Sequence, residues 1–379
     1  MRRVAVVGGG IAGLTAALAL ARHGVDVTLL ERADPVEPIG AGIQVSPNAM
    51  KVMRLLGLER ALNATASAPR EIVLRDGYSG AALAAIPLGP AIERRHGAPY
   101  LTVHRGDLQA VLLDAARHEP RVDIRTGAEV VRCGEDGTVH HSRGRAQFDL
   151  VVGADGVRSA VRSAVQSGRV DLSGATAWRA NVPTAALPRT FAGPRTGVWL
   201  GAEGHVVHYP IRSGMMTNVV CIVPGEGGPE KAFRSWSLPL RELLGRAERW
   251  APWPTPRTDP MRPWSRDRIV LIGDAAHAMW PYAAQGGAMA IEDGWTLAVA
   301  LAERGQAAIE AWEVERRGRV ARVAALADRN RRIYHARGPI RVARNVIMRG
   351  VPVPALMRAM DSVYSWDPPA KRSRPKASD

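Results

Sequence analysis

Residues 4–31 of the chain read VAVVGGGIAGLTAALALARHGVDVTLLE. The apolar run at 4–7 is typical of a strand buried in a parallel sheet. Alanine and leucine dominate residues 14–22, which favours a helix, and Gly24 is expected to end it before a second strand at 25–30. This succession of strand, helix and strand predicts an α/β fold.

The glycines at 8, 10 and 13 form a fingerprint for binding a dinucleotide. Gly8 permits a tight turn, Gly10 lets the backbone approach a pyrophosphate, and Gly13 lets the helix pack closely on the strand. Glu31 ends the second strand, where a carboxylate accepts hydrogen bonds from a ribose 2′-hydroxyl. An unphosphorylated adenosine ribose therefore fits better than that of NADP, but this pattern alone leaves NAD and FAD open.

Residues 1–21 also resemble a secretory signal, because two arginines precede an apolar run. Three glycines interrupt that run and an acid stands where a ribose would bind, so we favour the cofactor-binding interpretation. No stretch is long and apolar enough to span a bilayer, and the chain has two cysteines, Cys133 and Cys221. We therefore expect a protein that does not cross a membrane, in a reducing, cytoplasmic setting.

Two later segments repeat the design of a buried strand that runs into a glycine turn. FDLVVGADGVRS at 148–159 and RIVLIGDAAH at 268–277 each place an aspartate, Asp155 and Asp274, just beyond the strand. The carboxyl ends of strands form the edge at which open α/β sheets bind ligands. Either aspartate alone is equally consistent with a helix cap, but three such segments in this order indicate a flavoprotein.

With these motifs, residues 1 to about 345 resemble the class A flavoprotein aromatic hydroxylases, which share the fold of 4-hydroxybenzoate hydroxylase. The resemblance implies a Rossmann-like FAD-binding domain, a β-sheet substrate domain and a C-terminal helix. It also implies that Asp274 lies near the ribityl and pyrophosphate groups of FAD, and that Asp155 and Gly156 serve the flavin and NAD(P)H.

Three further segments, at 40–49, 205–210 and 281–286, are similar to one branch of that family. The branch contains salicylate hydroxylase, 3-hydroxybenzoate 6-hydroxylase and 6-hydroxynicotinate 3-monooxygenase. Ala284 stands where the commoner pattern has glycine, and alanine is usual in this branch. The resemblance implies a single-component enzyme with FAD as its cofactor and NADH or NADPH as a transient co-substrate.

The loop at 281–287 follows the third motif and precedes an expected helix. Backbone N–H groups at a helix start stabilise the negative charge of reduced flavin, and Gly286 and Gly287 permit close approach. The alternative is a glycine-rich turn without a chemical role. The family resemblance further implies that Arg105 lies beside FAD and that Val130 contacts adenine. The candidate cofactor-binding residues are therefore Gly8, Gly10, Ala12, Gly13, Glu31, Arg32, Gln44, Val45, Arg105, Val130, Asp155, Gly156, Asp274, Pro281, Gly286 and Gly287, and no metal site is expected.

One segment of strand composition carries the substrate-site candidates. His205 and Tyr209 are four residues apart, so both face the same side of the strand and His208 faces the other. An imidazole and a phenol beside a flavin can bind and deprotonate a ring hydroxyl. Spacing alone favours ordinary half-buried sheet residues; the family resemblance favours the catalytic role. Gln285 is a third candidate, through its amide, whereas His277 is expected to be structural.

The expected reaction is hydroxylation of a phenolic or heteroaromatic small molecule that carries a carboxylate. NAD(P)H would reduce FAD, dioxygen would add at flavin C4a, and the resulting hydroperoxide would deliver oxygen to the ring in a site that excludes water. One alternative is an FAD-dependent epoxidase, halogenase or reductase that acts on an apolar metabolite. Another is a noncatalytic flavin-binding or nucleic-acid-binding protein.

The net charge of +15 raises the question of nucleic acid. Four of the 51 basic residues are lysines, which leaves 47 arginines spread over the whole chain, with no basic helix and no alternation of aromatic and basic residues. Attraction of an anionic aromatic substrate is a simpler use of this charge. We therefore expect a small aromatic substrate and O2 as partners, no nucleic acid and no membrane, and a monomer or homodimer.

The FAD-binding domain is expected to be discontinuous, because the strands of the substrate domain fall between its motifs. The C-terminal helix is expected to break near Gly350, Pro352 and Pro354. The expected division is residues 1–70, 97–168 and 262–335 for the FAD-binding domain, 71–96 and 169–261 for the substrate domain, 336–370 for a C-terminal helical segment and 371–379 for a disordered tail.

Overall fold

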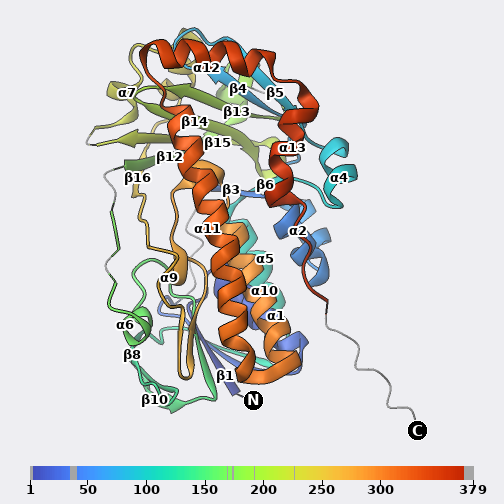
Figure 1. Cartoon of the computed structure of the whole chain (residues 1–379), viewed down its shortest axis with the longest axis vertical. Helices are drawn as coiled ribbons and strands as arrows, with labels where there is room; N and C mark the ends of the chain where they lie inside the picture. The colour runs from blue at the N-terminus through green and yellow to red at the C-terminus, as the bar shows by residue number, and fades with distance from the viewer. Residues whose placement is uncertain are drawn as a thin grey trace.

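The computed structural model places two large sheets at opposite ends of the molecule, with helix α11 (Ile309–Tyr334) running alongside both (Figure 1). It describes residues 3–34, 41–168, 170–172, 175–191, 193–225 and 227–370. The tail expected at 371–379 lies outside the described residues.

The first sheet has six strands and forms the nucleotide-binding half of the α/β fold. Its strands are parallel except β17, which pairs antiparallel with β18, and the pairing of β1 with β2 and β11 places the first two sequence motifs side by side. In spatial order the strands are β17 (Ser265–Arg266), β18 (Ile269–Leu271), β11 (Leu150–Gly153), β1 (Arg3–Val7), β2 (Asp26–Leu30) and β7 (Val122–Arg125).

Close backbone approach explains the glycines around helix α1 (Ile11–Arg22). A Cβ on Gly13 would overlap the carbonyl oxygen of Gly8, and a Cβ on Gly294 would lie 2.8 Å from the backbone nitrogen of Ala16. Helix α10 (Gly286–Arg304) therefore packs directly on α1. Gly24 follows α1 with φ of 84°, so it ends the helix as the sequence predicts.

The second sheet has seven strands, which are antiparallel except for the parallel pair β13 and β4. Cys221 lies in this sheet and Cys133 in β8, and both thiols are free. In spatial order the strands are β16 (Ala251–Pro254), β12 (Ala175–Pro183), β15 (Met216–Pro224), β14 (Gly204–Ile211), β13 (Arg195–Gly201), β4 (Glu71–Asp76) and β5 (Ala82–Pro87).

Two small sheets and several short helices complete the connections. The small sheets are β3 (Gly42–Val45) with β6 (Leu101–His104), and β8 (Val130–Cys133) with β9 (Thr138–His141) and β10 (Gly144–Gln147). The helices are α2 (Pro47–Leu55), α3 (Glu59–Thr65), α4 (Pro90–His96), α5 (Arg105–Arg117), α6 (Arg162–Val165), α7 (Pro229–Ala232), α8 (Leu238–Gly245) and α9 (Asp274–His277), with the 3₁₀ turns η1 (Thr184–Ala186), η2 (Arg189–Phe191), η3 (Arg212–Gly214), η4 (Pro281–Ala283) and η5 (Gly305–Ala308).

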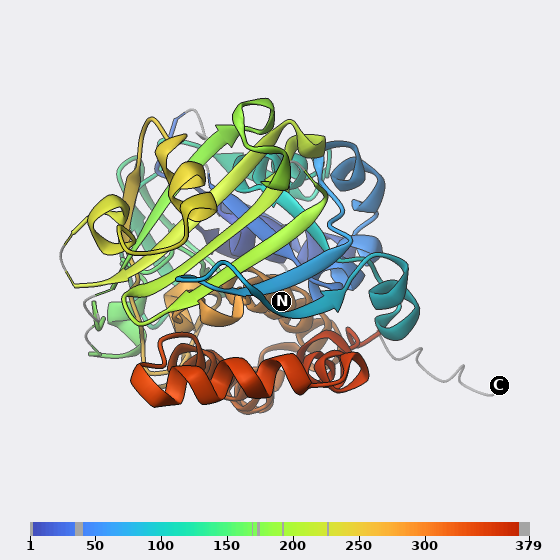
Figure 2. The same ribbon diagram turned by 90° about the horizontal axis from the view of Figure 1, so that it is seen from above.

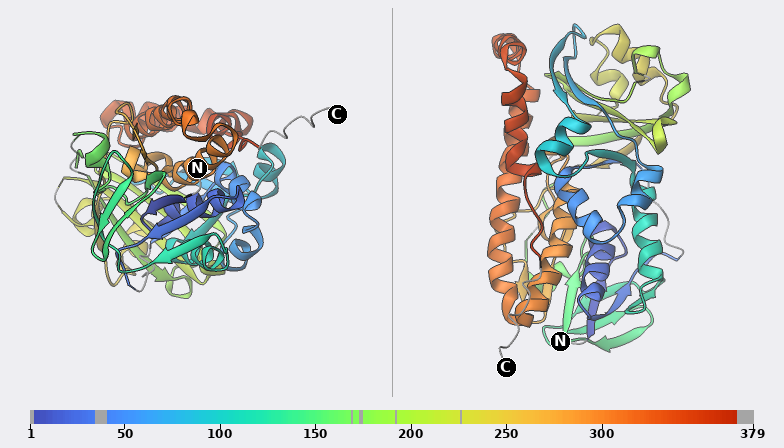
Figure 3. Two further views of the ribbon diagram at one scale, coloured as in Figure 1. Left: turned by 90° about the horizontal axis from the view of Figure 1, so that it is seen from below. Right: turned by 90° about the vertical axis from the view of Figure 1, so that its right-hand side faces the viewer.

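The C-terminal helices cover one side of the molecule from end to end. In the side view α11 continues into α12 (Gly338–Gly350) and α13 (Val353–Tyr364) (Figure 3), and from above α12 runs beside the seven-stranded sheet (Figure 2). The expected break lies between α12 and α13 at Pro352, whereas Pro354 sits in the first turn of α13, where a proline costs no hydrogen bond. No helix among the described residues is long and apolar enough to cross a membrane.

Candidate active site

A cavity of about 330 Å³ lies between the six-stranded and seven-stranded sheets. All three glycine-containing motifs reach it, although they are far apart in the chain. The nucleotide-binding half of the fold contributes Gly10, Ile11, Ala12, Ala154, Gly156 and Asp274. The loop before α10 and its first turn contribute Pro281, Ala284, Gly286 and Gly287, and the seven-stranded sheet contributes Arg179, His205, Val207, Tyr209, Val220, Ile222 and Trp253.

Two helices begin at this cavity, and their first N–H groups have no acceptor within the helix. The first backbone hydrogen bond of α1 runs from the N–H of Leu14 to the carbonyl of Gly10 at 2.9 Å, and that of α10 runs from the N–H of Met289 to the carbonyl of Gln285 at 2.8 Å. The N–H groups before Leu14 and before Met289 are therefore left for a ligand. A Cβ on Gly10 would meet no protein atom within 4 Å, so its missing side chain leaves open space. Two such helix starts suit a pyrophosphate and a negatively charged ring, and FAD carries both groups.

The two aspartates behave differently. Asp274 begins α9, is exposed and lines the cavity. Asp155 instead accepts the N–H groups of Ala160 at 2.7 Å and Val161 at 3.3 Å through Oδ2, which is the capping geometry considered for it above. Its neighbour Gly156 lines the cavity, while Asp155 Oδ1 is buried with no hydrogen-bond partner among the described residues.

Glu31 directly follows β2 and stabilises the glycine turn through hydrogen bonds. Its carboxylate oxygens accept the N–H groups of Gly9 at 2.6 Å and Ala33 at 2.8 Å. Gln44 and Arg105 line the cavity. Val45 and Val130 are buried and Arg32 is exposed, and none of these three residues lines the cavity, so their contacts with a cofactor stay predictions.

His205 and Tyr209 lie on the same face of β14 and both line the cavity. His208 points to the opposite face, where it packs edge-on against Phe191 with ring centroids 5.1 Å apart. Burial lowers the pKa of His205 well below its ordinary value, so the imidazole is neutral at neutral pH. Burial raises the pKa of Tyr209, a shift that Arg179 partly opposes, so its hydroxyl keeps its proton. The strand therefore presents a neutral base and a hydrogen-bond donor.

Arg179 on β12 was not anticipated by sequence reasoning. It lines the cavity with Tyr209 and Arg105. Burial lowers the pKa of its guanidinium, Tyr209 opposes this shift, and the positive charge of Arg105 adds to it. None of the described residues forms a hydrogen bond or ion pair with its guanidinium, which leaves a cation facing the cavity without a counter-ion. No signal in the sequence separates this arginine from the other 46 in the chain.

Gln285 is placed away from the cavity lining. Its side chain is 3 % exposed, its Nε2 donates to Ser46 at 3.1 Å, and its Oε1 accepts from Asn48 Nδ2 at 3.2 Å. These contacts fix the loop before α10 against α2. Its proposed contact with substrate stays a prediction that the geometry does not favour.

A buried ionic cluster lies behind the loop and the Gly273 turn. Asp293 accepts the N–H of Gly273 at 2.9 Å and lies 2.5 Å from His277 Nε2, so His277 is structural, as the sequence suggested. Arg316 donates to Asp293 at 2.8 Å and to Glu292 at 2.6 Å. The cluster holds the residues before Asp274 in place from inside the protein.

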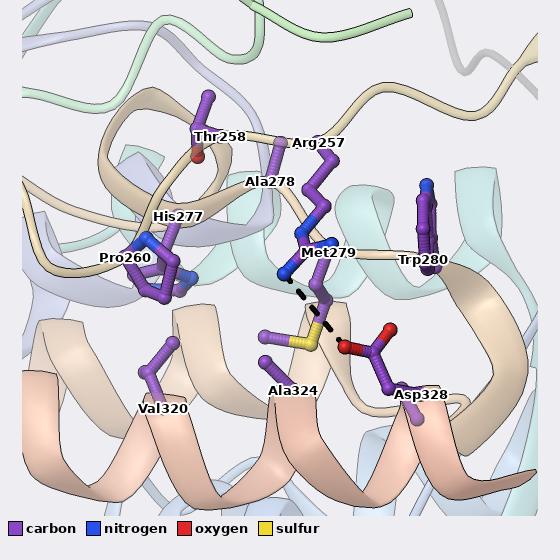
Figure 4. A pocket seen from close by; sticks show the side chains of 11 residues that line it. Arg257, Thr258, Pro260, His277, Ala278, Met279, Trp280, Val320, Ala324 and Asp328 are labelled. Carbon is purple, nitrogen blue, oxygen red and sulfur yellow. Dashed lines mark ion pairs between the residues drawn. The ribbon is translucent and has the colours of Figure 1, made fainter. Parts of the chain in front are cut away.

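The segment between α9 and η4 borders a second, much smaller cavity with room for about one water (Figure 4). Figure 4 shows Met279 and Trp280 above α11, with the ion pair of Arg257 and Asp328 at 3.7 Å crossing beside them. The guanidinium carbons of Arg257 and Arg331 lie 4.8 and 5.0 Å from the ring centre of Trp280. These contacts position the loop that leads into Pro281.

Known proteins share this architecture along almost the whole chain. The sequence family described as "FAD binding domain" matches residues 1–329. A 3-hydroxybenzoate 6-hydroxylase of Polaromonas naphthalenivorans (strain CJ2) is 36% identical and the match covers 96% of both chains; a 6-hydroxynicotinate 3-monooxygenase of Bordetella bronchiseptica is 34% identical, over 85% of this chain and 89% of the relative. A crystal structure of Klebsiella pneumoniae HpxO complexed with FAD and uric acid has a TM-score of 0.83 and 27% identity, covering 96% of this chain and 97% of that chain.

These likenesses confirm the fold and the FAD cofactor that the three motifs predicted, and the monooxygenase class that the family resemblance implied. They do not favour an epoxidase, halogenase or reductase. The chain belongs to the FAD binding domain family of flavin-dependent aromatic hydroxylases.

Proposed function

We propose that this enzyme hydroxylates a small aromatic or heteroaromatic ring that bears both a hydroxyl group and a carboxylate. The observation that carries the proposal is the guanidinium of Arg179, which lies in the same cavity as His205 and Tyr209 and has no ion-pair partner in the described part of the chain. A half-buried cation that has no counter-ion among the described residues favours an anionic ligand, and a planar guanidinium matches a carboxylate. The curated relatives described above are named for hydroxybenzoate and hydroxynicotinate.

FAD, reduced by NADH or NADPH, supplies the electrons and activates O2. Arg179, with Arg105 nearby, binds the carboxylate and so fixes which ring carbon faces the flavin. His205 accepts the proton of the ring hydroxyl, which makes the ring more nucleophilic, and Tyr209 donates a hydrogen bond to the resulting oxyanion. Apolar residues of the cavity lining limit the access of water.

The cofactor assignments are proposals as well. The first turn of α1, with Gly10 and Ala12, is assigned to the pyrophosphate, and the first turn of α10, with Gly286 and Gly287, to the flavin ring. Glu31 keeps lone pairs for the ribose because each of its oxygens accepts a single bond here. We also propose the domain division given above, a monomer or homodimer, and a cytoplasmic location consistent with two free cysteines.

The test is a substrate panel that separates the two functional groups. Hydroxybenzoates and hydroxypyridine carboxylates are compared with benzoate, which lacks the hydroxyl, and phenol, which lacks the carboxylate. NAD(P)H consumption, hydroxylated product and hydrogen peroxide are measured together. We expect coupled product with compounds that carry both groups. A panel in which no phenolic acid stimulates NAD(P)H oxidation contradicts the proposal.

A further inference from the structure

His205 is bonded to a second imidazole that sequence reasoning did not anticipate. Its Nδ1 lies 3.1 Å from Nε2 of His335, the residue that directly follows α11, 130 positions along the chain. Tyr282 packs against both rings, with centroid distances of 5.0 Å to His205 and 5.4 Å to His335. Three separate elements, β14, η4 and the end of α11, therefore hold the two imidazoles in hydrogen-bond contact.

The pair leads from the cavity toward the surface. His205 is 2 % exposed and lines the cavity, and since its Nδ1 is engaged by His335, Nε2 is the ring nitrogen left for a bound ligand. His335 is half-buried, so the far end of the pair is closer to solvent than the near end. A proton that reaches Nε2 of His205 therefore has a hydrogen-bonded neighbour that lies nearer to solvent.

We propose that His205 and His335 form a two-histidine relay, which carries the proton of the substrate's ring hydroxyl from the cavity to solvent. This inference rests on the proposed function, in which that hydroxyl is deprotonated. His335 acts through His205 and does not touch the substrate, so its role is to position and exchange a proton.

The relay exchanges tautomers and leaves no charge on either ring. Before transfer, His205 carries its proton on Nδ1 and donates it to Nε2 of His335, whose own proton is on Nδ1. The hydroxyl proton then moves to Nε2 of His205, the Nδ1 proton of His205 moves to Nε2 of His335, and the Nδ1 proton of His335 leaves to water. The O–H electron pair stays on the substrate as an oxyanion, and two neutral imidazoles remain.

The surroundings favour this neutral route over a stored imidazolium. Burial lowers the pKa of His335 to about 4, and the positive charges of three arginines contribute to the shift. Arg331 lies on α11, Arg337 directly before α12 and Arg344 within α12. The other titratable groups against the pair are Tyr282 of η4 and Tyr334 of α11, whose ring centroid is 5.3 Å from that of His205. Burial raises the pKa of both phenols to about 12, so neither is an anion that would stabilise an imidazolium.

Proton release on ligand binding tests the relay directly. Holoenzyme is mixed by stopped flow with 3-hydroxybenzoate in weak buffer that contains a pH-indicator dye, and the rate of proton release is recorded. His335→Gln retains an amide that can bond Nδ1 of His205 but cannot exchange tautomers. We expect it to slow proton release about tenfold or more, while its affinity for benzoate, which has no hydroxyl proton, stays within about twofold of the wild-type value.

Two further variants separate the relay from a structural role. His208→Gln removes the buried histidine on the opposite face of the same strand and should release the proton at the wild-type rate. His335→Ala should be slow, and added imidazole should restore its rate, with more basic substituted imidazoles giving a faster recovery. If His335→Gln does not fold, the imidazole-dependent rate of His335→Ala provides the test.

The outcomes distinguish the relay from the proposed function. If His335→Gln releases the proton at the wild-type rate, or if imidazole does not speed proton release by His335→Ala, the relay is overturned and the proposed function still stands. A wild-type protein that neither hydroxylates phenolic acids nor releases a proton on binding them overturns the proposed function, and the relay with it.

Discussion

Arg316 of α11 binds Asp293 of α10 at 2.8 Å from Nε to Oδ1, with side chains that are 2 % and 0 % exposed. Because Asp293 also accepts the N–H of Gly273, the bond connects a C-terminal helix to the glycine turn that presents Asp274 to the cavity. The geometry of the cofactor site therefore depends on a helix that carries no cofactor motif.

Arg316→Met should destabilise the protein by about 3 kcal/mol, at the lower end of the range for breaking a buried ion pair. It removes the guanidinium that Asp293 and Glu292 share, whereas Asp293 keeps its contact with His277 and Glu292 keeps its pair with Arg319. Retained FAD should fall as the Gly273 turn loosens. Urea denaturation and the ratio of flavin to protein absorbance measure the two effects. The control is Arg121→Met, whose exposed pair with Asp26 should change stability by less than about 1 kcal/mol. Equal effects of the two substitutions would show that the buried cluster has no special role.

Gly10→Ala separates cofactor binding from folding. A Cβ at this position meets no protein atom within 4 Å, so the apoprotein should lose at most the roughly 1 kcal/mol that alanine costs at the N-cap of α1. FAD affinity should fall about tenfold, the factor that 1.4 kcal/mol of lost contact energy represents. Thermal unfolding of the apoprotein and flavin titration measure the two quantities. Gly245→Ala, which also meets no protein atom but lies outside the cavity, should leave both unchanged.

Arg179→Met should raise KM for a carboxylated phenol by about 10- to 100-fold, since a hydrogen bond between charged groups contributes about 1.5–3 kcal/mol. Turnover of an uncharged phenol should be much less affected. Arg179→Lys keeps the charge without the planar fork and should lie between the two. Steady-state kinetics with a matched pair such as 3-hydroxybenzoate and 3-hydroxybenzyl alcohol provide the measurement. A similar loss with both compounds would assign Arg179 to folding and not to the carboxylate.

His205→Gln should lower kcat by about 10²- to 10⁴-fold, the usual contribution of a positioned general base. Tyr209→Phe removes one hydrogen-bond donor and should lower kcat by about tenfold. Product and hydrogen peroxide must be measured together, so that uncoupled oxidation of NAD(P)H is not counted as hydroxylation. If both variants hydroxylated the substrate at the wild-type rate, the substrate would not bind beside His205 and Tyr209.

Stability should fall as the pH drops below about 6.5, because buried histidines must charge on unfolding. Burial lowers the pKa of His208 to about 3 and, with the nearby arginines, that of His335 to about 4, and it lowers that of His205 well below the ordinary value. The unfolded chain therefore binds more protons than the folded one between these values and pH 6.5. In this window each group changes the free energy of unfolding by up to about 1.4 kcal/mol per pH unit, and above pH 6.5 it adds no pH dependence.

Urea denaturation at several pH values between about 4 and 8 measures this slope. His208→Gln should make the acid slope shallower. Stability that rises on acidification would contradict the assignment of neutral buried imidazoles.

The nucleotide-binding half was predictable because its signals are local. Gly8 and Gly13 must lack side chains for the backbone to approach itself, and a strand next to a helix is readable from composition. The face shared by His205 and Tyr209 was also predictable, since alternate side chains of a strand always point to the same side. Gln285 shows the limit of such reasoning, because its neighbours Gly286 and Gly287 line the cavity while its own side chain bonds Ser46 and Asn48 in the interior.

The sequence by itself determined the cofactor and the fold, since both follow from short motifs in which neighbouring residues fix the backbone. The reaction class came from the resemblance of those motifs to a known family. Only the tertiary structure decided which residues surround the substrate. Arg179 and His335 belong to no motif. Arg179 lines the cavity with Tyr209, and His335 bonds His205 from the end of a helix, because segments from distant parts of the chain pack together. Contacts between distant segments depend on the packing of the whole core, which local sequence patterns do not record.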